Sequence, residues 1–277
     1  MPVSPIGVFD SGYGGLTVLR SLVQKMPEYD YLYLGDNARA PYGNRPFEEV
    51  YQFTLESVQW LFRQGCPLVI LACNTASAKA LRTIQQNDLP TIDPAKRVLG
   101  VIRPTAEVIG ECSASGHVGV LGTVGTVESG SYLIEIAKFF PDLLVTQQAC
   151  PAWVDLVERN AHRGFEADNP VRQEIDAVFT KDAQIDTLLL ACTHYPLLMD
   201  KIRQYTPNHV QIIAQGDLVA DSLADYLKRH PRIAQLITTD GDRRFCTTGN
   251  AVLFETQASA FFGEAVRVNA VSLTTNP

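Results

Sequence analysis

Two cysteines occupy equivalent places in two similar stretches of the sequence. Cys73 follows the apolar run 69–72, Cys192 follows the apolar run 188–191, and polar residues come directly after each of them. A single free cysteine is more often a buried core residue than a functional one. Here two thiols each stand where a buried strand passes into a polar loop. This repeated placement favours a functional role for both.

Two thiols that face each other suit the inversion of a stereocentre at carbon. Inversion requires a base on one face of the carbon and an acid on the other, and the two groups exchange roles with the direction of the reaction. A free thiol has a pKa of about 8.5, so it can serve in either form near neutral pH. The α-proton of an amino acid is a very weak acid, so the carbanion that develops must also be stabilised, for example by backbone N–H groups and hydroxyls.

Three other ionisable residues are candidates to assist the thiols. Asp10 ends the first apolar run, where it either serves a thiol or caps the turn that follows. His194 lies two residues after Cys192. A lone histidine is more often a supporting residue, but the parallel between the two stretches favours proton exchange with the thiol. Glu158, taken by itself, is typical of an exposed carboxylate on a helix.

A glycine-rich turn at residues 10–15 precedes a predicted helix and is a candidate site for an anion. Its spacing matches neither the dinucleotide pattern G-x-G-x-x-G nor the P-loop, so a substrate carboxylate is a better candidate than a nucleotide. Lys79 falls inside a predicted helix and is expected at the surface rather than in a pyridoxal-phosphate Schiff base. We therefore expect no cofactor and no bound metal.

The composition is that of a folded protein with an acidic surface. The 277 residues are 46% hydrophobic and 19% charged, which is enough for two α/β domains. The formal net charge of −7 makes nucleic acid an unfavourable partner. The apolar runs have the length of strands, so no membrane span is predicted, and residues 1–5 lack the cationic start of a signal peptide. A cytoplasmic protein with six reduced cysteines is expected.

Strand-like and helix-like segments alternate along the chain. Such alternation predicts parallel sheets covered by helices, with ligands bound outside the carboxyl ends of the strands. The expected strands are 6–10, 31–34, 68–72, 118–121 and 187–191, and the expected helices are 16–26, 47–61, 75–86, 131–140 and 197–205.

An internal repeat divides the chain. Residues 6–12 resemble residues 118–124, and residues 69–75 resemble residues 188–194, in the same order. Two related α/β units are the simplest interpretation, and the C-terminal segment is too short to form a third. The expected domains are residues 1–98 together with 210–277, and residues 99–209.

The chain resembles the glutamate racemase family in motifs that follow the family's order and span nearly the whole sequence. Single motifs are weakly specific, whereas the set is highly specific. The matching motifs are residues 7–15, 35–43, 72–76, 119–123 with Thr126, 150–151 with 156–158, and 191–196. Some positions depart from the family. Cys246 and Asn250 stand where it usually has Tyr and Asp, and Asp155 stands where a proline is common.

The resemblance implies two pseudo-symmetric α/β domains with the active site between them. It implies that Cys73 takes the α-proton from the D-isomer and that Cys192 takes it from the L-isomer. Asp10 would assist Cys73, and Glu158 and His194 would assist Cys192. The residues that would surround the substrate are Ser11, Pro41, Tyr42, Gly43, Asn74, Thr75, Thr123, Thr126 and Thr193. Enzymes of this family supply D-glutamate for bacterial peptidoglycan and are often homodimers.

Two other functions stay open on the sequence. An aspartate racemase also has two cysteines on a similar fold, and the sequence does not give the length of the pocket. A metal-binding regulator is a different class, in which Cys73, Cys192 and His194 would be the ligands. The full set of loop motifs favours glutamate as the substrate.

Overall fold

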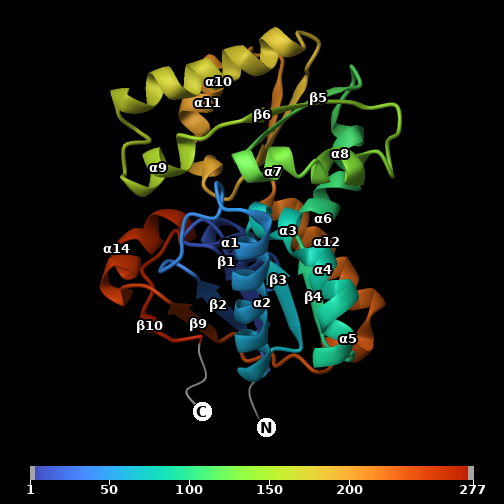
Figure 1. The fold of residues 1–277 in the computed structure, drawn as a ribbon, viewed down its shortest axis with the longest axis vertical. Helices are drawn as coiled ribbons and strands as arrows, with labels where there is room; N and C mark the ends of the chain where they lie inside the picture. The colour runs from blue at the N-terminus through green and yellow to red at the C-terminus, as the bar shows by residue number, and fades with distance from the viewer. Residues whose placement is uncertain (1–3, 274–277) are drawn as a thin grey trace.

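Two parallel sheets form the framework of the computed structural model, which describes residues 4–273. Their strand orders are β10-β9-β2-β1-β3-β4 and β6-β5-β7-β8. Figure 1 shows the two sheets one above the other, each flanked by helices. The strands of the first sheet are β1 (Ile6–Asp10), β2 (Tyr31–Gly35), β3 (Leu68–Leu71), β4 (Arg97–Gly100), β9 (Arg243–Thr247) and β10 (Val268–Ala270). Those of the second are β5 (His117–Gly122), β6 (Leu144–Ala149), β7 (Thr187–Ala191) and β8 (Gln211–Ala214).

The two sheets repeat one arrangement. A central strand, β1 or β5, lies between the next two strands of the chain, and a fourth strand, β4 or β8, pairs with the third. All of these pairs are parallel, with Phe9 opposite Leu71 in the first sheet and Leu121 opposite Leu190 in the second. β9 and β10 extend the first sheet beyond β2. The predicted α/β fold with two pseudo-symmetric halves is confirmed.

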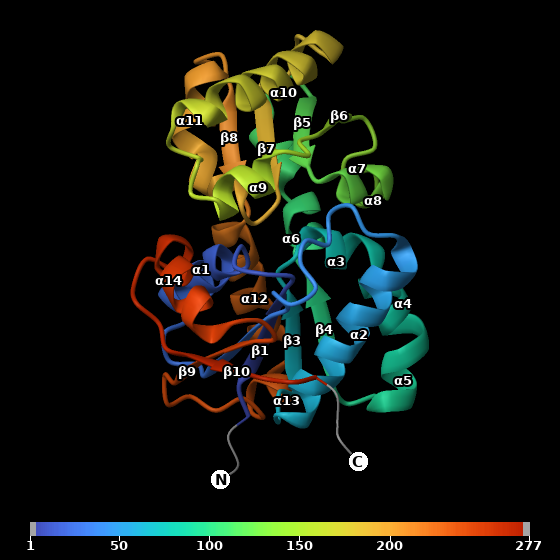
Figure 2. The same ribbon diagram turned by 60° about the vertical axis from the view of Figure 1, so that its left-hand side comes forward.

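Helices cover both sheets, as the two views in Figures 1 and 2 show. Around the first sheet are α1 (Leu16–Lys25), α2 (Phe47–Arg63), α3 (Asn74–Lys79), α4 (Leu81–Thr83), α5 (Leu89–Ile92), α12 (Gly216–Arg229), α13 (Pro231–Ala234) and α14 (Ala251–Phe262). Around the second are α6 (Ile102–Ala106), α7 (Val124–Glu128), α8 (Ser131–Ile136), α9 (Trp153–Glu158), α10 (Asp168–Lys181) and α11 (Met199–Tyr205).

The central strands are buried on both faces, which explains their nearly continuous apolar sequences. In β1, Val8 belongs to the apolar layer that contains α1, and Phe9 belongs to the layer that contains α2. In β7, Leu190 belongs to the layer with α10, and Leu189 to the layer with α8. Successive side chains point to opposite faces of a strand, so each central strand joins two layers of core.

The chain crosses between the two sheets after β4 and again after β8. β4 pairs with β3, whereas β8 pairs with β7. The expected boundary at residue 98 therefore falls inside a strand of the first sheet, and the one at residue 210 precedes a strand of the second. We propose a first domain of residues 4–100 with 216–273, and a second domain of residues 101–215.

The helix expected at residues 75–86 is interrupted. α3 ends at Lys79, and at Ala80 the backbone turns to φ −114°. The chain then continues through α4, a π-helical turn at Ile84–Asp88 and α5. A π-turn takes up extra residues within a helical path, which a regular spacing of apolar residues does not reveal.

Within residues 4–273 no helix is both long and apolar enough to cross a membrane. Residues 1–3, part of the segment on which the signal-peptide expectation rests, lie outside the described residues. All six cysteines are free thiols.

Candidate active site

The two cysteines singled out by the sequence line one cavity between the two sheets. Cys73 follows β3 and is the N-cap residue of α3, and Cys192 directly follows β7. Each has 6% of its surface exposed, and both border a cavity of about 230 Å³. Because β3 and β7 occupy matching positions in the two sheets, the fold brings one thiol from each domain to the same space.

Every predicted site residue lines this cavity except Asp10 and Thr126, which lie behind its wall. The sequence analysis did not select seven further lining residues: Ala40, Asn44, Val124, Cys150, Pro151, Val154 and Asp155. Cys150, Pro151 and Asp155 lie in or next to a family motif, which was the available signal for them. Val124 and Val154 are apolar wall residues whose types carry no chemical signal.

The Cys73 thiol is held by groups of its own domain. It donates to the Ser11 hydroxyl at 3.5 Å and accepts the Ala76 N–H at 3.5 Å. Burial, together with the nearby Asp10 carboxylate, raises the pKa of Cys73 to about 12. The thiol is therefore protonated at neutral pH in the free enzyme.

Asp10 is fully buried behind Cys73. Its carboxylate accepts the Gly12 N–H at 2.9 Å and the hydroxyl of Thr193 at 3.4 Å, a residue that follows β7 in the other half of the molecule. Burial raises the pKa of Asp10, and the positive charge of His194 partly opposes this. Asp10 does not line the cavity, and the Cys73 thiol is a lining group whose pKa the Asp10 charge raises.

Cys192 lies beside a positively charged group, whereas Cys73 lies near the Asp10 carboxylate. His194 is 4% exposed, and its Nε2 lies 3.2 Å from Oε1 of Glu158, whose side chain is 29% exposed. Burial disfavours the imidazolium, but hydrogen bonds with Cys192 and Glu158 outweigh it and raise the pKa of His194 to about 10. His194 is therefore a cation at neutral pH. The edge of its ring meets Phe261 of α14, with 5.4 Å between ring centroids.

Hydroxyl groups form one wall of the cavity. The Thr123 hydroxyl lies 3.0 Å from those of Thr75 and Thr126, and the last two are 3.5 Å apart. Thr126 is fully buried. It therefore supports the other two hydroxyls from behind.

Among the described residues, no lysine or arginine lines the cavity, and the imidazolium of His194 is the cationic group at its wall. The loop containing Tyr42 and Gly43 brings backbone to the cavity. The Tyr42 hydroxyl bonds to the buried carboxylate of Asp36, which also accepts from Arg39 Nε at 2.7 Å. The Gly43 carbonyl accepts the Gly125 N–H of the other domain at 2.8 Å. These bonds hold the loop against both domains.

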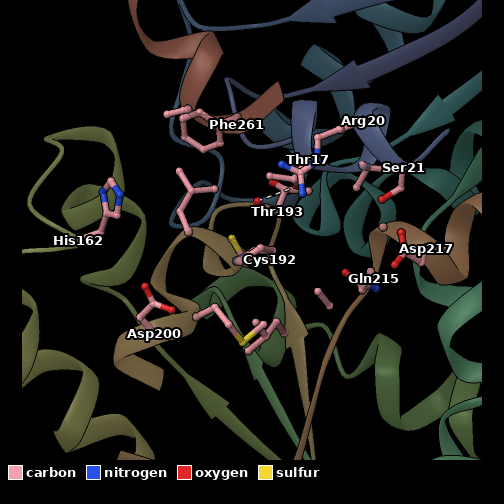
Figure 3. Close-up of a pocket in the computed structure, with 18 of the residues that line it drawn as sticks. Thr17, Arg20, Ser21, His162, Cys192, Thr193, Asp200, Gln215, Asp217 and Phe261 are labelled. Carbon is pink, nitrogen blue, oxygen red and sulfur yellow. Dashed lines mark hydrogen bonds between the residues drawn. The ribbon is translucent and has the colours of Figure 1, made fainter. Parts of the chain in front are cut away.

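A second cavity, of about 340 Å³, lies on the other side of Cys192 and is shown in Figure 3. It shares Cys192 and Thr193 with the first cavity, and it is bordered by α1 and the start of α12. The Thr17 hydroxyl donates to the Thr193 carbonyl at 3.1 Å. The Cys192 loop is thus a thin wall between two cavities, and nothing in the sequence indicated the second one.

Among residues 4–273, no three or more His, Cys, Asp or Glu side chains are grouped so that they could hold a metal ion. Cys192 interacts with His194, whereas Cys73 is hydrogen-bonded to the Ser11 hydroxyl. The geometry therefore gives no support to the metal-binding regulator considered from the sequence.

A repeated α/β domain that presents one thiol from each half to a shared cavity is the arrangement expected of an amino-acid racemase. The chain belongs to the Asp/Glu/Hydantoin racemase family, whose sequence model matches residues 6–223. It is 39% identical over 275 residues to the glutamate racemase of Ruegeria sp. (strain TM1040), covering 96% of this chain and 99% of that one.

Solved structures give the same result for the fold. Glutamate racemase isoform RacE1 from Bacillus anthracis superimposes with a TM-score of 0.89 at 34% identity, covering 99% of both chains. Glutamate racemase from Francisella tularensis, solved in complex with D-glutamate, superimposes with a TM-score of 0.86 at 29% identity, also covering 99% of both chains.

Proposed function

We propose that this enzyme interconverts L-glutamate and D-glutamate by proton transfer between two thiols, without a cofactor. The observation that carries the proposal is the meeting of Cys73 and Cys192, one from each domain, at a single cavity. The similarity to glutamate racemases over nearly the whole chain supports glutamate as the substrate.

The proposed reaction removes one proton from Cα and adds another to the opposite face of Cα. From D-glutamate, the Cys73 thiolate takes the α-proton, and the Cys192 thiol gives its proton to the opposite face of the carbanion. From L-glutamate, Cys192 takes the proton and Cys73 supplies one. Before each turnover the base must be a thiolate. Asp10 is the neighbour placed to take the proton from Cys73, and the His194 imidazolium is placed to balance the charge of a Cys192 thiolate and to return a proton to it.

Substrate binding is proposed to rely on neutral donors together with the His194 imidazolium, because no lysine or arginine among the described residues lines the cavity. Thr75 and Thr123 offer paired hydroxyls supported by Thr126. The other proposed contacts are Ser11, Pro41, Tyr42, Gly43, Asn74 and Thr193, all of which line the cavity. Such donors stabilise a carboxylate and the adjoining carbanion by hydrogen bonding.

The same proposal places the enzyme in the cytoplasm, where its product would enter peptidoglycan synthesis, and as a homodimer. Reduced thiols are stable in that compartment, and the proposed reaction requires them. Analytical ultracentrifugation checks the dimer: a mass of twice the 30.5 kDa chain supports it, and a single-chain mass contradicts it.

The direct test is the circular dichroism of D-glutamate incubated with the purified protein and no added cofactor. The signal should decay to zero with wild type and persist with Cys73→Ala and Cys192→Ala. Decay with D-aspartate but not with D-glutamate would move the assignment to aspartate racemase. No decay with either would refute the racemase proposal and would make the zinc content the next measurement.

A further inference from the structure

Four buried polar side chains form a closed hydrogen-bonded group at the junction of the two domains. The Asn74 amide donates to Gln215 Oε1 at 2.7 Å. Gln215 Nε2 lies 2.6 Å from the Tyr132 hydroxyl, which donates to Asn74 Oδ1 at 2.6 Å. Gln215 Nε2 also lies 2.8 Å from the hydroxyl of Thr105. None of the four side chains is more than 4% exposed.

Two of these residues lie where the chain crosses between the domains, and the other two lie one in each domain. Asn74 begins α3 in the first domain, and Tyr132 lies in α8 of the second. Thr105 lies in α6, just after the first crossing, and Gln215 lies at the second crossing, where β8 passes into α12. Figure 1 shows α3, α6 and α12 together at the junction, and Figure 3 labels Gln215 at the edge of the second cavity.

In this group, each hydrogen bond has a defined donor and acceptor. The tyrosine hydroxyl has a single proton, and that proton goes to Asn74, so the hydroxyl must accept from Gln215. The second proton of Gln215 Nε2 goes to Thr105, whose own hydroxyl donates to the Val101 carbonyl at 3.0 Å. Loss of any one of these side chains would leave a neighbour without its hydrogen-bond partner, and burying an unpaired polar group costs free energy of folding.

We propose that Gln215 is a positioning residue, which fixes the Asn74 amide and thereby the start of the helix that carries Cys73. Asn74 lines the cavity next to Cys73, and the thiol accepts the N–H of Ala76 in the same turn. Because Tyr132 is in the other domain, the group also sets this turn relative to the domain that carries Cys192. The proposal rests on the proposed racemisation and names what holds one of its two bases in place.

Gln215→Glu tests this with almost no change in volume. An ionised glutamate keeps an acceptor for Asn74 but has no proton to donate to Tyr132, so the tyrosine proton turns towards the new carboxylate and Asn74 Oδ1 loses its donor. We expect kcat to fall by about 10- to 100-fold, the scale of an error of about 1 Å in a reacting group, while KM changes little. Tyr132→Phe removes the same link without adding a charge and should act in the same direction.

Isotope effects separate positioning from loss of folded protein. With α-deuterated D-glutamate, the bond that breaks is the one proposed for Cys73, so the isotope effect on kcat/KM should rise in both variants. With α-deuterated L-glutamate, Cys192 breaks the C–D bond and Cys73 then protonates the carbanion. Because the variants slow this second step, which does not involve the deuterium, the isotope effect should fall. Partial unfolding reduces the amount of active enzyme and alters neither ratio.

Ser131→Ala is the matched control. Ser131 donates to the Ala78 carbonyl across the same junction at 3.1 Å, beside Tyr132 but outside the group, and its removal should leave kcat and both isotope effects unchanged. Unchanged kinetics in Gln215→Glu and Tyr132→Phe, or an equal loss in Ser131→Ala, would overturn the positioning role while wild-type racemisation stands. An inactive wild type would remove the proposed function and this inference with it.

Discussion

The two halves of the site match in backbone but differ in charge. Cys73 and Cys192 follow the third strand of each repeat, β3 and β7, and are equally buried. Beside Cys73 stands the buried carboxylate of Asp10, and beside Cys192 stands the imidazole of His194. The internal repeat thus gives the two thiols matching positions, whereas Asp10 at the end of β1 and His194 after β7 give their surroundings opposite charges.

That difference indicates where the free enzyme keeps its protons. The Asp10 carboxylate and burial both favour the neutral thiol at Cys73, whose pKa is raised to about 12. His194 is favoured as a cation by its contact with Cys192 and Glu158. We therefore expect Cys73 to hold its proton before substrate binds, whereas the equilibrium constant between the two enantiomers is one whatever the state of the enzyme.

Removing either thiol should have the largest effect. Cys73→Ala and Cys192→Ala should each lower kcat/KM by about 10²- to 10⁴-fold, because each removes an acid–base group used in both directions. Polarimetry with both enantiomers measures the loss. Cys246→Ala is the control, since Cys246 is buried in β9 and does not line the cavity. Full activity in either site variant would show that its thiol is not needed.

Asp10→Asn and His194→Asn should each slow proton transfer at a different thiol, Cys73 and Cys192 respectively. Each should lower kcat/KM by about 10- to 100-fold, the equivalent of a hydrogen bond to a charged group worth about 1.5–3 kcal/mol. Enantiomers have equal free energy, so the loss must be equal in both directions. The isotope effect identifies the side: Asp10→Asn should raise it for D-glutamate, and His194→Asn for L-glutamate. The same pattern in both variants would contradict the assignment of one assistant to each thiol.

Glu158→Gln should have a smaller effect than His194→Asn. The Glu158 side chain is 29% exposed, so water screens its interaction with His194. We expect kcat/KM to fall roughly 2- to 10-fold, the equivalent of a typical hydrogen bond worth about 0.5–1.5 kcal/mol. Steady-state kinetics beside His194→Asn measures the ratio. A loss as large as that of the histidine variant would make Glu158 a direct participant.

The smallest effect should be on the pH dependence of stability. The pKa of His194 rises from 6.5 to about 10 on folding, so its charge contributes stability that is full below pH 6.5 and is lost as the pH rises towards 10. The Tm advantage of wild type over His194→Asn should therefore shrink across that range. Thermal unfolding at several pH values measures it. An advantage that grows with pH would mean that His194 is buried as a neutral ring.

The sequence predicted the strands that carry the chemistry and missed the edge strands β4, β6, β8 and β10 as well as β9. β1, β3 and β7 are buried along their whole length, because helices cover both faces, and their largely apolar runs are easily found. β6, with Gln147 and Gln148, is half-exposed and lacks an apolar run. β4 and β8 are short and partly exposed, so they too lack a long apolar run.

For the site, residue type and motif order predicted the cavity wall, but contacts between distant residues were out of reach. Asp10 and Thr193 are far apart in the chain, and only the fold shows that they bond. Gln215 had no sequence signal, because its role depends on Asn74 and Tyr132 meeting it at the junction. The opposite charges beside the two thiols likewise depend on burial, which spacing does not reveal.

The most direct test of the two-thiol account is the position of deuterium after brief reaction of D-glutamate in D₂O. If one thiol takes the α-proton and the other, already exchanged with solvent, returns a deuteron, then L-glutamate formed at low conversion should carry deuterium at Cα. The remaining D-glutamate should still carry protium. Deuterium appearing equally fast in the recovered D-glutamate, or protium retained in the L-product, would mean that a single group serves both faces and would contradict the account.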